Sequence, residues 1–203
     1  MRPGLVIFDM DDVLCHYDLG RRLRALSQIS GKTPRDIRAA IWDSGFEEDA
    51  DSGGYPDADV YLAEFSQRIG HPISRAEWIA ARRESMIPSE NVLALAKSIG
   101  TISRIAIYTN NGPIVKNSLD DLFPEAAAIF SERYCSYEFG TKKLDPDSFT
   151  RLLATLKVSP ADTWFIDDKR SNVQGARIAG LQGHHFRSYD RLLDDAKSLG
   201  FEL

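Results

Sequence analysis

Near its start the chain reads Leu5-Val6-Ile7-Phe8-Asp9-Met10-Asp11-Asp12-Val13-Leu14. The apolar run Leu5–Phe8 predicts a buried strand, because it is rich in β-branched and aromatic residues. Three carboxylates, those of Asp9, Asp11 and Asp12, follow within four positions. Since ligands of open α/β sheets bind at the carboxyl ends of the strands, this stretch predicts a negatively charged sheet edge suited to a cation.

The composition predicts an ordinary globular protein with a substantial core. The chain has 203 residues, 43% of them hydrophobic, and a formal net charge of −5. Without a basic surface, nucleic-acid binding is not expected, and no apolar stretch is long enough to span a bilayer. The two cysteines, Cys15 and Cys135, are too few for a disulfide framework, and Asp9 interrupts the apolar start too early for a secretory signal. We expect a cytoplasmic protein that is a monomer or a dimer.

Strands alternate with helices from about residue 89 onward, which predicts βαβ units and a parallel sheet. Apolar runs at 105–108, 127–130, 163–166 and 183–186 are the expected strands. The stretch between the first strand and residue 89 has helical periodicity instead, broken by an acidic, glycine-containing loop at 43–56. The sequence therefore predicts a Rossmann-like core from residues 1–14 and 89–203, with an inserted all-helical domain over residues 15–88.

Polar residues end three of these strands: Asp9, Asp11 and Asp12 end the first, Thr109-Asn110-Asn111 the second, and Asp167-Asp168 the third. In a parallel sheet these ends lie along one edge. One acidic strand end is explained by capping of the next helix, but three together indicate a hard-cation site of the kind that Mg²⁺ occupies. Lys143, just before a helix start at Asp145-Pro146, is a candidate to offset the negative charge and bind a phosphoryl oxygen.

The chain resembles the haloacid dehalogenase-like hydrolase superfamily. Four motifs match in order: Asp9-Met10-Asp11, Thr109-Asn110, Lys143 before Leu-Asp-Pro, and Asp167-Asp168. The resemblance covers the whole chain, and the helical insertion is similar to the α-helical cap of subclass I, with sugar-phosphate phosphatases as the nearest relatives. It implies a Mg²⁺-dependent phosphatase of a small phosphorylated metabolite.

The resemblance also implies a role for each matched residue. Asp9 would be the nucleophile that forms an aspartyl-phosphate, and Asp11 the general acid and then the general base. Asp9, Asp168 and the backbone carbonyl of Asp11 would hold Mg²⁺, with Asp167 orienting or joining that set. Thr109 and the backbone N–H of Asn110 would bind phosphoryl oxygens, and Lys143 would neutralise charge in the transition state.

The chain departs from the family pattern at two positions. Asp12 replaces the usual glycine after the second aspartate, which the turn tolerates if Asp12 adopts the left-handed conformation. Leu144 replaces the usual proline after the lysine. In the acidic loop, we expect Phe46 and Asp49 to line the substrate side of the pocket, with Asp49 accepting hydrogen bonds from sugar hydroxyls. Among Arg21, Arg22 and Arg24, one that faces the core would bind an anion.

Three alternatives stay open at this stage. A haloacid dehalogenase also uses an aspartate nucleophile but needs no metal, so it leaves Asp11 and Asp168 unexplained. A phosphomutase would retain the aspartyl-phosphate, and nothing in the sequence separates it from a hydrolase. A binding module could keep the fold without turnover, although the complete set of matched residues argues against it.

Overall fold

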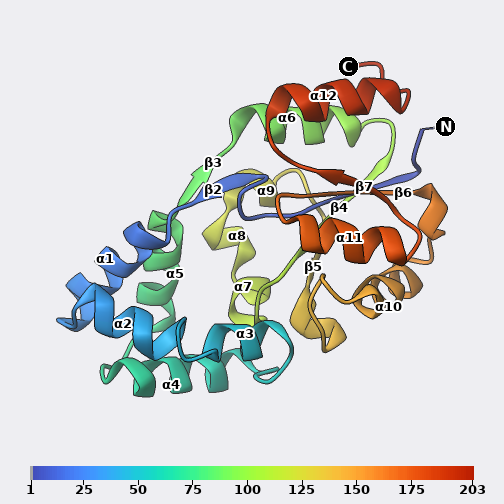
Figure 1. The fold of residues 1–203 in the computed structure, drawn as a ribbon. Helices are drawn as coiled ribbons and strands as arrows, with labels where there is room; N and C mark the ends of the chain where they lie inside the picture. The colour runs from blue at the N-terminus through green and yellow to red at the C-terminus, as the bar shows by residue number, and fades with distance from the viewer. Residues whose placement is uncertain (1) are drawn as a thin grey trace.

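The computed structural model describes residues 2–203 and shows an α/β fold around one parallel sheet (Figure 1). The five strands lie in the order β5-β4-β1-β6-β7, and every neighbouring pair is parallel. Their bounds are β1 (Leu5–Phe8), β4 (Arg104–Thr109), β5 (Glu132–Cys135), β6 (Thr163–Asp167) and β7 (Gln182–His185). The predicted α/β class with a Rossmann-like sheet is confirmed, and β1 lies at the centre of the sheet.

Helices cover both faces of the sheet, and the side chains of β1 alternate between them. Val6 and Phe8 belong to a hydrophobic cluster with α6 (Glu90–Ile99) and α12 (Tyr189–Ser198). Leu5 and Ile7 belong to the cluster with α10 (Pro146–Leu156) and α11 (Arg170–Ile178). A strand buried on both faces explains why β1 is continuously apolar rather than alternating.

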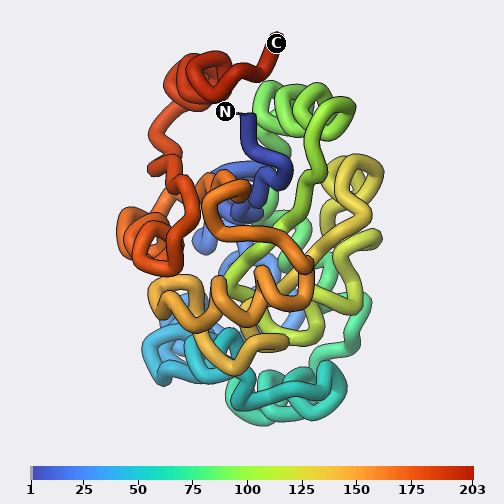
Figure 2. Tube along the Cα trace, turned by 90° about the vertical axis from the view of Figure 1, so that its right-hand side faces the viewer, coloured from blue at the N-terminus to red at the C-terminus, as the bar shows by residue number. Residues whose placement is uncertain are grey.

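Residues 15–88, called the helical segment below, carry five helices. These are α1 (Leu19–Ser30), α2 (Pro34–Ile41), α3 (Phe46–Asp51), α4 (Ala58–Ile69) and α5 (Arg75–Glu84). Figure 1 shows them on the side of the molecule away from the two termini, and in Figure 2 α4 lies at the bottom with both termini at the top. The expectation that this segment is all helical was wrong at its two ends, where β2 (Cys15–Tyr17) and β3 (Met86–Pro88) form an antiparallel pair.

The predicted loop at 43–56 contains a short helix, α3, that the sequence pattern did not reveal. Phe46, at its start, is 2% exposed and stacks on Tyr61 with ring centroids 5.1 Å apart. Phe46 also meets Tyr55 edge-on and packs near Phe65. A helix of six residues is too short to be stable alone, so aromatic packing against α4 holds it in place.

The strand expected at 127–130 was also wrong. This run begins at the last residue of α9 (Pro124–Ala127) and continues as a turn, and Phe130 packs edge-on against Phe8 of β1. The edge strand is instead β5, whose residues Glu132, Arg133 and Tyr134 are all partly exposed. Polar, half-exposed residues are usual on edge strands. A search of the sequence for apolar runs therefore does not find β5.

The remaining elements connect the sheet strands. They are α7 (Pro113–Asn117), α8 (Leu119–Leu122) and the 3₁₀ helices η1 (Ser136–Phe139) and η2 (Pro160–Asp162). Cys15 and Cys135 are both buried and both free thiols. Within residues 2–203, no helix combines the length and the apolar character needed to cross a membrane.

Candidate active site

The carboxyl ends of β1, β4 and β6 meet at one cavity of about 210 Å³ that also contacts the helical segment. The sheet places these ends together because β1 pairs in parallel with both β4 and β6. The residues from the core that line the cavity are Asp9, Asp11, Asp12, Thr109, Asn110, Asn111, Lys143, Asp168, Lys169 and Asn172. The helical segment, with β2 at its start, contributes Tyr17, Arg22, Trp42, Glu47, Asp51 and Arg82.

The ammonium of Lys143 lies between two carboxylates at the centre of this site. Its Nζ is 2.7 Å from Oδ1 of Asp9 and donates a hydrogen bond of 2.6 Å to Oδ2 of Asp167. A third, longer hydrogen bond of 3.3 Å goes to the backbone carbonyl of Tyr108. Lys143 is 1% exposed. Burial opposes its charge, but the two carboxylates outweigh that penalty and raise the pKa of the ammonium.

Asp167 is the structural anchor of this group. The side-chain amide of Asn172 donates to both of its oxygens, at 3.0 and 3.1 Å, and the backbone N–H of Lys169 donates at 2.8 Å. Burial opposes its charge, but the ammonium of Lys143, a hydrogen bond with Asp9 and the backbone N–H of Lys169 lower its pKa. Asp167 therefore stays ionised, and it fixes Lys143 against Asp9.

Asp9, Asp167 and Asp168 bring carboxylate oxygens within 4.8 Å of one another. Burial, followed by repulsion from Asp167, raises the pKa of Asp9 well above its ordinary value, and the same two causes raise the pKa of Asp168. One ammonium does not neutralise three crowded carboxylates. A set of hard oxygen donors with excess negative charge fits a divalent cation of the Mg²⁺ type.

Thr109 and Asn110 lie opposite this cluster, at the end of β4. The hydroxyl of Thr109 accepts a hydrogen bond of 2.8 Å from the side-chain amide of Asn111. The side-chain oxygen of Asn110 accepts from the backbone N–H of Lys143 at 3.0 Å. Residues 140–145, called the lysine loop below, carry Lys143 between η1 and α10. Asn110 thus ties the lysine loop to β4, an interaction that the sequence did not predict.

Asp12, which takes the place of a glycine, adopts the left-handed conformation that the turn requires, with φ of 59°. Its Oδ1 accepts a hydrogen bond of 3.0 Å from the backbone N–H of Tyr17 and lies 3.1 Å from Nδ1 of His16. These contacts tie the turn after β1 to strand β2. Asp12 therefore has a structural task that offsets the strain of its backbone.

Gly175 allows the lysine loop to approach helix α11. A Cβ atom at this position would lie 2.5 Å from the backbone oxygen of Lys143 and 2.9 Å from that of Leu144. Both are backbone atoms, so the loop itself would have to move. The absence of a side chain at Gly175 therefore helps to set the position of Lys143.

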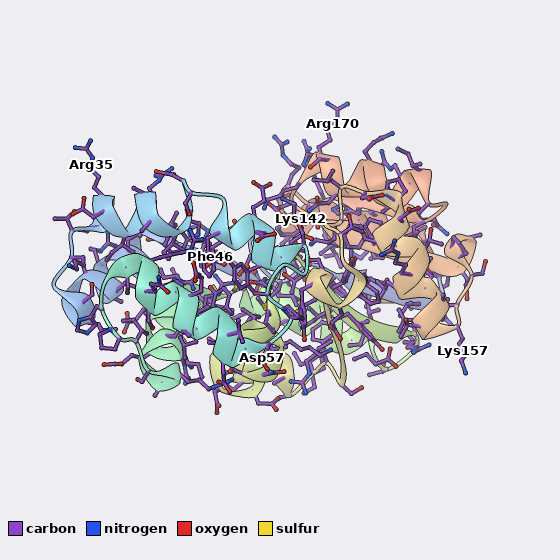
Figure 3. The ribbon with its side chains drawn as sticks, turned by 90° about the horizontal axis from the view of Figure 1, so that it is seen from below. Arg35, Phe46, Asp57, Lys142, Lys157 and Arg170 are labelled. Atoms are coloured by element: carbon purple, nitrogen blue, oxygen red, sulfur yellow. The ribbon has the colours of Figure 1, made fainter. Side chains whose placement is uncertain are left out.

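The helical segment meets the cavity through residues other than those expected. Phe46 is buried in the aromatic cluster with Tyr61 and Phe65, and Asp49 is exposed; neither lines the cavity. Figure 3 labels Phe46 among the helices of the helical segment. Glu47 and Asp51, on the same short helix, line it instead. Glu47 and Asp51 are one helical turn apart and share a face of α3, whereas Asp49 is exposed to solvent. The prediction treated this segment as a loop and therefore did not identify the helix face that lines the cavity.

Two buried arginines reach the cavity. Arg22, 4% exposed, lies between the rings of Trp42 and Trp78, with Cζ 5.1 and 4.6 Å from their centroids. Arg82, 2% exposed, donates a hydrogen bond of 2.6 Å to Oδ2 of Asp11. Arg22 was among three candidates, but Arg82 was missed. Arg82 follows Trp78 by four residues, so the two side chains lie on the same buried face of α5. This spacing could have identified Arg82 as buried from the sequence.

A family model described as haloacid dehalogenase-like hydrolase matches residues 3–180. The chain is 34% identical over 93 residues to flavin mononucleotide hydrolase 1 of Arabidopsis thaliana, covering 46% of this chain and 38% of that protein. It is 25% identical to a phosphatase of Mycobacterium tuberculosis, covering 98% and 96% of the two chains.

Among solved structures, the fold is similar to that of a haloacid dehalogenase family enzyme of Bacteroides thetaiotaomicron, which is complexed with magnesium and inorganic phosphate. The TM-score is 0.75 at 20% identity, with 94% of this chain and 98% of that chain covered. At this identity the likeness concerns the fold.

Substituting Gly175 with alanine tests the packing that positions Lys143. Alanine normally stabilises a helix interior by about 1 kcal/mol relative to glycine. Here we expect Gly175→Ala to destabilise the protein by about 1–3 kcal/mol, because overpacking forces the lysine loop to move. Urea unfolding measures the change, and the exposed neighbour Gln174→Ala is the control. Equal or greater stability in Gly175→Ala would show that the loop is not constrained by this contact.

The raised pKa of Asp9 predicts how stability depends on pH in metal-free protein. A carboxyl with a raised folded-state pKa binds more protons folded than unfolded, so stability falls as pH rises from the unfolded pKa through the folded one. With EDTA, Asp9→Asn should therefore be more stable than the parent at pH 7, and the difference should shrink toward pH 4. Urea unfolding from pH 4 to 8 measures it, with exposed Asp194→Asn as control. A parent protein as stable as Asp9→Asn at pH 7 would contradict the assignment.

Proposed function

We propose that this chain, which belongs to the haloacid dehalogenase-like hydrolase family, is a Mg²⁺-dependent phosphatase of a small phosphorylated metabolite of the sugar-phosphate type. The observation that carries the proposal is the contact of Lys143 with Asp9 beside Asp167 and Asp168. A carboxylate nucleophile, a fixed cation and a group of acids suited to a metal are the parts that phosphoryl transfer requires.

In the proposed reaction a carboxylate oxygen of Asp9 attacks the phosphorus atom as the bond to the leaving alcohol breaks. The electron pair of that bond goes to the alcohol oxygen, which takes a proton from the carboxyl of Asp11. The resulting aspartyl-phosphate is attacked by water, whose proton returns to Asp11, and cleavage of its phosphorus–oxygen bond restores Asp9. Lys143 stabilises the charge that develops on the phosphoryl oxygens, together with the Thr109 hydroxyl and the Asn110 backbone N–H.

Asp9, Asp168 and the backbone carbonyl of Asp11 would hold Mg²⁺, with Asp167 at the edge of that set. When bound, the ion would neutralise the carboxylates and the substrate phosphate, so that an anionic nucleophile and an anionic substrate could approach each other. The burial and the neighbouring Asp167 that raise the pKa of Asp9 support this assignment.

The substrate side of the cavity supports a small, hydroxyl-bearing leaving group. A volume of about 210 Å³ is below the usual range for drug-sized ligands, which favours a compact metabolite over a flavin nucleotide. Glu47 and Asp51 offer carboxylate oxygens to hydroxyls. Burial, and then repulsion from Glu47, raises the pKa of Asp51. Residues 15–88 would act as a cap that excludes bulk water.

The same contacts argue against a haloacid dehalogenase. Such an enzyme has no use for a metal, and the crowded carboxylates of Asp9, Asp167 and Asp168 would then stay uncompensated. A phosphomutase would use the same groups, so product analysis must separate it from a hydrolase. A cytoplasmic location and a monomeric or dimeric state complete the proposal; the free thiols of Cys15 and Cys135 support a reducing compartment.

A panel of phosphorylated metabolites that includes hexose phosphates, small polyol phosphates and flavin mononucleotide tests the function. With Mg²⁺ we expect release of inorganic phosphate from small sugar or polyol phosphates, and loss of at least about 10³-fold in kcat for Asp9→Asn, because no nucleophile remains. EDTA should abolish turnover and Mg²⁺ restore it. A hexose phosphate converted to its positional isomer would identify a mutase, and inactivity across the whole panel would refute the proposal.

The corrected substrate side of the cavity gives a separate prediction. Glu47→Gln and Asp51→Asn should each raise KM for a hydroxyl-rich substrate about 5- to 30-fold, since each loses roughly 1–2 kcal/mol of hydrogen bonding. Their KM for p-nitrophenyl phosphate should change little. Asp49 is exposed on the same helix, so Asp49→Asn should change KM for neither substrate. A larger effect of Asp49→Asn than of the other two would restore the original assignment.

A further inference from the structure

Arg82 makes the closest contact of any charged group with the carboxylate of Asp11. It lies in the last turn of α5, 71 residues away along the chain, and is 2% exposed. One guanidinium nitrogen donates to Oδ2 of Asp11 at 2.6 Å. The guanidinium carbon also lies 4.2 Å from the centroid of the Tyr17 ring, which supports it from one side.

The chain path fixes this contact more firmly than a surface ion pair. Helix α5 ends at Glu84, and its C-cap Ser85 leads directly into β3, which pairs with β2 just after the turn that carries Asp11. The backbone N–H of Asp18 donates to the carbonyl of Ser85 at 2.8 Å. The end of α5 is therefore tied to the segment that follows Asp11, and Arg82 has little freedom to leave.

The two oxygens of Asp11 have different surroundings. Oδ2 accepts the bond from Arg82 and a weaker one of 3.4 Å from the side-chain amide of Asn111. In the part of the chain that the structure describes, Oδ1 has only a contact of 3.8 Å from the thiol of Cys15. Oδ2 is thus held by Arg82, whereas Oδ1 makes no close hydrogen bond within the described residues.

We propose that Arg82 is a positioning residue that holds Oδ2 of Asp11, so that Oδ1 faces the leaving oxygen of the substrate. The proposal rests on the phosphatase function proposed above. In the first step the O–H bond of Asp11 breaks, the proton goes to the leaving alcohol oxygen, and a carboxylate remains. The guanidinium stabilises that carboxylate and keeps it aimed for the water that follows. A misaligned acid loses most of its benefit, because proton transfer needs hydrogen-bond geometry.

A comparison of two leaving groups tests this role. The p-nitrophenolate ion departs without a proton, whereas an alkoxide needs one. In Arg82→Gln we expect kcat/KM for an alkyl phosphate, such as glycerol 2-phosphate, to fall about 10²-fold, within the range of general acid catalysis. For p-nitrophenyl phosphate, kcat/KM should fall by less than about 5-fold, because it reports only the steps up to the first irreversible one. Arg83→Gln, an exposed arginine next in sequence, is the matched control.

A double-mutant cycle separates positioning from mere packing. In an Asp11→Asn background, Arg82→Gln should cause little further loss on the alkyl phosphate, since the group that it positions is gone. Arg82→Lys keeps the charge with different geometry and serves if Arg82→Gln unfolds; it should show the same split between the two substrates. Thermal unfolding of each variant monitors folding.

Two results would overturn the role of Arg82, and a third would overturn the phosphatase function. Equal losses of Arg82 variants on both substrates would overturn the proposal and assign the guanidinium to phosphate binding or to packing. Full additivity with Asp11→Asn would overturn it as well. If the parent enzyme hydrolyses neither phosphate ester in Mg²⁺, the phosphatase function fails, and that result is distinct from a failure of the role of Arg82.

Discussion

The site depends on one buried ion pair network, in which the ammonium of Lys143 bridges Asp9 and Asp167. An ion removed from water costs several kcal/mol unless partners compensate it, so the buried ammonium of Lys143 and the buried carboxylate of Asp167 depend on their contact with each other. Asn172 fixes Asp167, and Gly175 lets the lysine loop come close enough. The sheet, by placing β1 between β4 and β6, brings the network to the carboxyl edge where a substrate can reach it.

The helical segment completes the site by different means. It places four charged side chains at the cavity. Arg82 donates a hydrogen bond to Asp11, Glu47 and Asp51 of α3 contribute carboxylates, and Arg22 packs against the rings of Trp42 and Trp78. The hydrophobic cluster on one face of the sheet continues into the same helices. In the proposed function, the reacting groups would therefore belong to the core, and the groups that select and orient the substrate would belong to the helical segment.

The sequence was sufficient to predict the sheet, because its central strands are continuous apolar runs, and to predict where Asp9, Thr109 and Asp167 meet. It was insufficient where long-range packing decides the local structure. The short helix at Phe46 forms through aromatic contacts with α4, and the edge strand β5 is too polar for an apolar-run criterion. The contact of Arg82 with Asp11 joins positions 71 residues apart, and only the path of the folded chain brings them together.

The proposed function depends on the covalent phosphorylation of Asp9 during turnover. It is tested most directly by reduction with borohydride during steady-state hydrolysis of p-nitrophenyl phosphate in Mg²⁺, followed by peptide mass spectrometry. An acyl phosphate at Asp9 is reduced to homoserine, so the account predicts homoserine at position 9 only when both substrate and Mg²⁺ are present. Hydrolysis of the substrate with Asp9 left unreduced, or with the modification at another carboxylate, would contradict it.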